Sequence, residues 1–201
     1  MKKVLSILLL FISFSTSVSA YDFMVDGLCY DINRDSISVS VTYERYSRNN
    51  YKNLRSEIVI PERIEHNGKT YTVTSIDYGA FGGCTGLTSV IMPNTVDFIG
   101  YQAFYGCTGL TSVTIPNTVT EIGSSAFSGC ISLTSVKIPN SFTSIGGDAF
   151  SGTAWFNNQP DGLIYIGNVA YEYKGEMPDG TSIVLKDGCT RITDFAFDGC
   201  T

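Results

Sequence analysis

Cysteine and histidine are the side chains of this 201-residue sequence best suited to nucleophilic, redox or metal chemistry, and the chain has six cysteines and one histidine. Four of the cysteines recur at the same place in a repeated motif: Cys84, Cys107, Cys130 and Cys200. In stacked repeats their Cα atoms would lie within disulfide reach, but parallel Cα–Cβ bonds make the disulfide dihedral of ~90° hard to reach. We therefore expect a buried ladder of thiols rather than disulfides, and the sequence leaves the state of Cys29 and Cys189 open.

Any Ser–His–Asp or Cys–His site would have to use His66, the one histidine of the chain. This residue falls in the segment His66-Asn67-Gly68-Lys69, which predicts a hairpin turn with a solvated histidine. The sequence has no nucleophile elbow, zinc-protease motif, phosphate loop or dinucleotide-binding glycine pattern, and its carboxylates are scattered. We therefore expect no catalytic residues, no cofactor, no metal site and no enzymatic activity.

The segment from Asp31 to Ser36 has the opening spacing of a calcium-binding loop. Ser36 and Thr42 occupy the positions where such a loop needs glycine and glutamate. We therefore expect a plain β-turn at residues 33–35, between strands over residues 28–32 and 36–43.

The elements that position these side chains come from a repeat of 23 residues. An Ala-Phe pair marks each copy, at Ala80-Phe81, Ala103-Phe104, Ala126-Phe127 and Ala149-Phe150, and again 47 residues later at Ala196-Phe197. In one copy, Val113 and Ile115 alternate with polar residues, which predicts a strand with one apolar face. Pro116 should end that strand, and Ser124 should cap a short helical turn that directs Phe127 inward.

The resulting pattern, L-x-x-V-x-I-P-x-x-V-x-x-I-G-x-x-A-F-x-x-C, resembles the BspA-like leucine-rich-repeat family of bacterial surface and secreted proteins. The resemblance covers residues 58–153 and 181–201. It implies a curved solenoid, export, and a role in adhesion or protein binding, and it brings no catalytic residues. The expected fold is a β-rich leucine-rich-repeat solenoid, α/β by convention, whose 23-residue coils stack with a parallel sheet and short helical turns.

The chain divides into five predicted segments. Residues 1–20 read as a secretory signal peptide, residues 21–57 as an N-terminal β cap, residues 58–153 as the repeat coils, residues 154–180 as a β-hairpin interruption, and residues 181–201 as a final incomplete coil. Within the final coil, residues 183–185 should return to the strand position. Because the sequence stops after a Gly-Cys turn, we expect either a fragment of a longer array, an end covered by a partner, or a naturally short product.

Two groups of residues are candidates for ligand binding. The first shares the outward slot of the predicted principal strand: Ile91, Thr114 and Lys137, with Val59 and Val184. The second is aromatic: Tyr78, Phe98, Tyr101 and Tyr105. Exposed aromatic side chains are efficient contact anchors, and the sheet face of a solenoid is a common binding surface.

The charge and hydropathy pattern restricts the partners. The formal net charge of −6 and the absence of a basic run argue against nucleic acid as a ligand. After residue 20 no apolar run is long enough to span a membrane. We expect an exported, non-enzymatic scaffold for protein–protein interaction or adhesion, at the cell surface or secreted, with the periplasm possible. The alternatives are a structural or display spacer of a longer surface protein and a carbohydrate-binding module.

Overall fold

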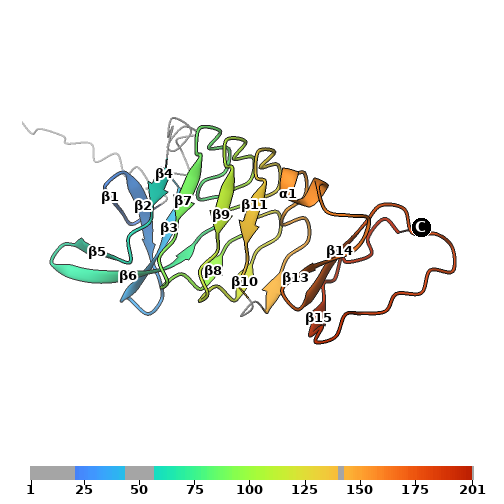
Figure 1. Ribbon diagram of the computed structural model, residues 1–201. Coiled ribbons are helices and arrows are strands. Elements are labelled where there is room, and N and C mark those ends of the chain that lie inside the picture. Colours follow the sequence, from blue (N-terminus) through green and yellow to red (C-terminus); the bar gives the residue numbers. More distant parts are fainter. Residues whose placement is uncertain (1–20, 44–56, 140–142, 201) are drawn as a thin grey trace, which may run out of the picture.

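The structure, a computed structural model, describes residues 21–43, 57–139 and 143–200 (Figure 1). The predicted signal peptide at residues 1–20 and part of the predicted N-terminal cap, residues 44–56, lie outside the described residues.

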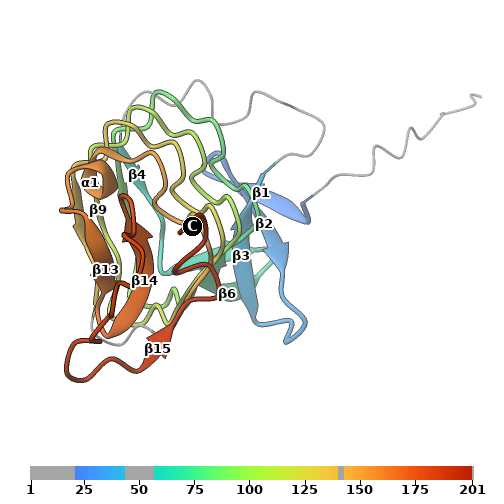
Figure 2. The ribbon, with the colours of Figure 1, turned by 90° about the vertical axis from the view of Figure 1, so that its right-hand side faces the viewer.

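The described chain is a solenoid with two rows of short parallel strands. The principal row contains β4 (Glu57–Val59), β7 (Ser89–Ile91), β9 (Ser112–Thr114) and β11 (Ser135–Lys137). The second row contains β6 (Lys69–Ile76), β8 (Phe98–Ile99), β10 (Glu121–Ile122) and β12 (Ser144–Ile145). Figure 2 shows β4 and β9 on one side of the coils and β3 and β6 on another. The pairing of Val113 with Val136 and of Ile122 with Ile145 confirms the 23-residue register.

The phenylalanine of each complete coil enters a single interior column. The rings of Phe81, Phe104, Phe127 and Phe150 are fully buried. Successive centroids lie 5.1, 5.1 and 5.2 Å apart, with interplanar angles of 13°, 5° and 2°. Because identical apolar slots repeat at one spacing, stacking coil on coil is the arrangement that buries them all.

A column of glycines lets the coils approach this closely. At Gly100, Gly123 and Gly146 an added Cβ atom would lie 2.8, 2.4 and 2.3 Å from backbone atoms of the preceding coil. Such contacts are far inside van der Waals distance, so side chains at these positions would push the coils apart.

The prediction of short helical turns at the Ala-Phe pairs is wrong. Ser125, which would follow the predicted cap residue Ser124, has a positive φ of 55°, and the Phe127 amide donates to the Ala149 carbonyl of the next coil at 2.8 Å. Alternate amides therefore bond along the solenoid axis to the next coil, and the amides between them close tight turns within their own segment, as the Ser128 amide does on the Ser125 carbonyl at 3.1 Å. Within the described residues the one helix is α1 (Ala154–Asn157), where the Thr153 hydroxyl accepts from the Phe156 amide at 3.0 Å.

The N-terminal segment extends the second row of strands. Strands β1 (Phe23–Val25), β2 (Leu28–Ile32) and β3 (Ser38–Thr42) pair antiparallel, and β3 then pairs parallel with β6. Strand β5 (Arg63–His66) pairs antiparallel with β6, with His66 opposite Lys69, which confirms the predicted hairpin turn. The core of the first coil is thereby covered by sheet.

A hairpin interrupts the array after α1, as predicted. Strands β13 (Gly162–Ile166) and β14 (Val169–Lys174) pair antiparallel, and β14 pairs parallel with β15 (Arg191–Ile192) (Figure 1). The hairpin packs against the end of the core through side chains that are almost completely buried: Ile166, Val169, Ala170 and Tyr171.

The final coil departs from the prediction in two ways. Residues 183–185 form no strand, and Val184 is 91% exposed. Phe197 is 37% exposed and lies outside the phenylalanine column, with its ring centroid 6.5 Å from that of Tyr173. The physical reason is that α1 and the hairpin replace the preceding coil, so these residues have no principal strand beside which to pair.

Candidate functional site

The cysteines of the complete coils are packing residues. Cys84, Cys107 and Cys130 are buried, and the thiols of Cys107 and Cys130 donate to the carbonyl oxygens of Phe81 and Phe104, each at 3.1 Å. Hydrogen bonds with the neighbouring cysteine thiols, together with burial, raise the pKa of the Cys107 thiol. This confirms the expected ladder of thiols for these three residues.

The remaining cysteines lie elsewhere. Cys200, which was expected in the ladder, is half-buried, because the final coil does not continue the column. Cys189 is also half-buried, and its thiol donates to the Arg191 carbonyl at 3.3 Å. Cys29 is completely buried in β2.

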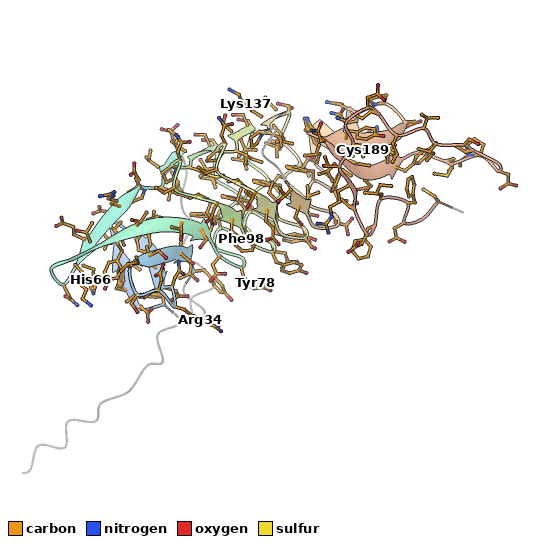
Figure 3. The ribbon with its side chains drawn as sticks, turned by 90° about the horizontal axis from the view of Figure 1, so that it is seen from below. Arg34, His66, Tyr78, Phe98, Lys137 and Cys189 are labelled. Carbon is orange, nitrogen blue, oxygen red and sulfur yellow. The ribbon has the colours of Figure 1, made fainter. Side chains whose placement is uncertain are left out.

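His66 is held by an aromatic ring. Its imidazole stacks on Phe23 with centroids 4.1 Å apart and an interplanar angle of 4°, and its Nε2 atom lies 3.0 Å from the side-chain nitrogen Nδ2 of Asn67. His66 thus lies in the predicted turn, but its ring is only partly solvated, because the stacking half-buries it. Figure 3 shows His66 near one end of the array and Cys189 near the other, so they cannot act together.

The segment resembling a calcium loop is a capped turn. The Asp35 carboxylate accepts from the amides of Ile37 and Ser38, each at 2.9 Å, and from the Ser38 hydroxyl at 2.7 Å. These hydrogen bonds lower the pKa of Asp35. In the described part of the chain no group of three histidine, cysteine or acidic residues is placed to hold a metal ion.

The first candidate group forms a continuous surface, which we call the sheet face: Val59, Ile91, Thr114 and Lys137. Val59 lies beside Ile91 and Thr114 beside Lys137 in the strand register. The isoleucine and the valine are 49% and 59% exposed. A shallow hollow of about 380 Å³ runs along this surface, bordered by Ser89, Ile91, Asn94, Ser112, Thr114 and Pro116. Val184, predicted in the same slot, does not belong to it.

The aromatic group lies on another side of the coils, as Lys137, Tyr78 and Phe98 show in Figure 3. Tyr78 and Tyr101 are 50% and 44% exposed, and their rings stack 5.5 Å apart at 13°. Tyr43 continues this row, with its ring centroid 6.3 Å from that of Tyr78. Tyr105 is exposed and Phe98 is half-buried. The sheet face and this row of tyrosines are thus two separate surfaces.

A third surface feature joins segments far apart in the sequence. The hollow has a volume of about 330 Å³ and is bordered by Tyr101, Ser124, Ser125, Gly147, Asp148, Tyr171, Glu172, Phe195 and Asp198. Of these residues the sequence pointed to Tyr101 alone, because the others come together only through the placement of the hairpin and the final coil. One local signal was available: Phe195 stands where other coils carry Gly79, Gln102, Ser125 or Asp148.

Comparison with known proteins gives a consistent result. Residues 63–177 match, in six copies, the family described as BspA type leucine-rich-repeat region. A leucine-rich-repeat protein from Bacteroides ovatus is 30% identical, with a TM-score of 0.63 over 87% of this chain and 38% of that protein. A second, from Bacteroides capillosus, is 26% identical, with a TM-score of 0.55 over 66% of this chain and 92% of that one.

More distant relatives support the fold alone. The leucine-rich-repeat protein TpLRR from T. pallidum is 21% identical, with a TM-score of 0.52 over 86% of this chain and 82% of that protein. No protein of curated function matches the sequence. The chain spans 38% of the length of its B. ovatus relative. In the part that the structure describes, no helix is long and apolar enough to cross a membrane.

Proposed function

Because this chain belongs to the family of BspA-type leucine-rich-repeat proteins, we propose that it is an exported, non-enzymatic scaffold that binds a protein partner through its sheet face. The place of action is the cell surface or the surrounding medium. The basic, apolar and small-residue sequence of residues 1–20 supports export.

One observation carries the choice of surface. Val59 and Ile91 lie side by side and expose about half of their surface, on strands whose backbone is fixed by parallel pairing. Small and hydroxyl-bearing side chains surround them, so a partner can approach closely. A rigid apolar centre with a polar rim is the usual anatomy of a protein interface, and fixing it beforehand lowers the entropy cost of binding.

A non-catalytic role accords with the chemistry of the chain. Its one histidine is stacked on Phe23, and the thiols of Cys107 and Cys130 donate to carbonyl oxygens inside the core. The buried thiols are closed to a substrate, and the histidine is hydrogen-bonded to the side chain of its neighbour Asn67.

The test is partner capture with matched variants. The chain from residue 21 onward, carrying a photo-crosslinker at Thr114, is incubated with a fraction of extracellular proteins, and the crosslinked protein is identified and purified. We expect Ile91→Asp to weaken the affinity for that purified partner by at least about tenfold, the loss typical of a central contact residue. The control is Ile131→Asp, because Ile131 is 62% exposed but lies in a turn away from the sheet face.

A display spacer makes the opposite prediction. If both aspartate variants bind as the wild type does, the sheet face is no binding surface and the proposed function is wrong. An equal loss in both variants would also contradict it, because a general effect of added charge would then explain the result.

A further inference from the structure

The junction between the coils and the final segment contains a groove made of two adjoining hollows. Their volumes are about 330 and 310 Å³, at the lower end of the ~300–1,000 Å³ typical of ligand sites. Both hollows are bordered by Tyr101, Ser124, Gly147 and Phe195. We call this feature the junction groove. Its floor consists of glycine and serine, so the backbone lies close to any occupant.

The first hollow is anionic. Asp148, Glu172 and Asp198 border it, and no lysine or arginine does. The second hollow adds Glu121 and Asp194 against a single cation, Arg191. Within the described residues the one ion pair is between Glu62 and Arg63, at the start of β5, so no salt bridge neutralises the groove.

The surroundings of Glu172 disfavour the charged form of its carboxyl group. Glu172 is half-buried, and its removal from water together with the charge of Asp148 raises the pKa of its carboxyl group. A positive charge placed between the two carboxylates would stabilise their charged forms and so offset both effects.

Aromatic rings form the walls. Tyr101 is 44% exposed and is held in place by stacking on Tyr78, and Phe195 is 55% exposed. The Phe195 ring lies directly against Gly147, where an added Cβ atom would be 2.6 Å from the ring. Faces of aromatic rings attract cations, and their apolar surface packs against the methylene stem of a long cationic side chain.

We propose that the junction groove binds a lysine or arginine side chain of an extended segment of the protein partner. The stem would pack between Tyr101 and Phe195 and the cationic head would lie among Asp148, Glu172 and Asp198. The volume of the first hollow suits one such side chain. This inference rests on the proposed function for the identity of the partner as a protein, but not for the chemistry of the groove.

Charge distinguishes this occupant from a sugar. A neutral glycan could stack on Tyr101, but it would leave three carboxylates without a counter-charge, whereas a basic side chain supplies one. The net charge of −6 acts in the same direction at longer range, since it attracts basic segments toward the chain.

The experiment uses small probes on the isotope-labelled chain, followed by nuclear magnetic resonance. The probe is Nα-acetyl-lysine methylamide, the matched control is the norleucine analogue, which lacks the charge, and the third arm is cellobiose. We expect the lysine probe to shift the amide signals of Ser125, Gly147 and Glu172 saturably, and to bind more weakly at high salt. The double variant Asp148→Asn/Glu172→Gln should weaken it at least tenfold, and Tyr101→Ala at least threefold.

Matched variants check the assignment. Asp97→Asn and Tyr105→Ala remove an exposed carboxylate and an exposed tyrosine outside the groove, and should leave lysine binding unchanged. Equal binding of the norleucine analogue, binding of cellobiose but not lysine, or no saturable shift at groove residues would each overturn the inference. Because the probe is a single amino-acid derivative, lysine binding with an inert sheet face would contradict the proposed function alone.

Discussion

The hydroxyl group of Tyr171 accepts a hydrogen bond of 3.1 Å from the backbone amide of Phe150. In the preceding coils the equivalent amide donates to an alanine carbonyl of the next coil, as Phe127 does to Ala149 at 2.8 Å. The Tyr171 ring also meets the Phe150 ring edge-on, with centroids 6.3 Å apart. The hairpin therefore ends the phenylalanine column, because Tyr171 supplies a side-chain acceptor in place of the missing backbone carbonyl and packs its ring against Phe150.

Removal of this hydroxyl should destabilise the fold. Tyr171→Phe keeps the ring but leaves a buried amide without an acceptor, which costs about 1–3 kcal/mol of unfolding free energy. Urea denaturation measures the change. The control is Tyr165→Phe: the Tyr165 hydroxyl accepts from the exposed Lys186 amide at 3.1 Å, where water can take its place. Equal losses in the two variants would mean that burial of the amide has no part in the effect.

The central ring of the column should be the most sensitive core position. Phe127→Ala empties a fully buried slot between Phe104 and Phe150, and we expect a loss of about 3–5 kcal/mol in unfolding free energy. Phe197→Ala, at an exposed ring outside the column, should cost clearly less. A loss below about 1 kcal/mol for Phe127→Ala would contradict the interior column.

Stability should fall at alkaline pH. Burial, aided by the charges of Asp26 and Cys29, raises the pKa of Tyr30 from its ordinary 10.0 to about 12, and burial raises the pKa of Tyr171 as well. The folded chain therefore keeps protons that the unfolded chain loses, so this contribution is intact below about pH 10 and disappears as the pH rises toward 12. Urea denaturation at a series of pH values measures it, and Tyr30→Phe should make the dependence shallower. A stability that is flat across this window would contradict the prediction.

The thiols should fall into two classes of reactivity. Cys84, Cys107 and Cys130 are buried, and the pKa of Cys107 is raised, so a disulfide reagent should modify them only after unfolding. Cys189 and Cys200 are half-buried and should react in the native protein. Mass spectrometry of the labelled peptides, with and without urea, separates the classes. Rapid native labelling of Cys107 would show that the ladder opens to solvent.

The principal row of strands, the inward phenylalanines and the cysteine ladder of the complete coils could be predicted from the sequence, whereas the second row of strands was not predicted. Each follows from a pattern such as Val113 with Ile115, repeated every 23 residues, because strands in register bury such a pattern together. The turns at the Ala-Phe pairs could not be predicted in the same way. Whether the amide of Phe127 bonds within its own segment or to the next coil depends on how closely the neighbour approaches, which the glycine column permits.

The sequence by itself thus determined the interior of the complete coils. It also determined which side chains the repeat turns outward, on the sheet face and in the row of tyrosines. The tertiary structure alone decided the junction groove and how the phenylalanine column ends, since Asp148, Glu172 and Phe195 come from a coil, the hairpin and the final segment. The physical reason lies in the range of the interactions. A repeat carries its contacts to the next copy at a constant spacing, whereas the hairpin has no copy, so its position follows from packing its own buried side chains against the open end of the core.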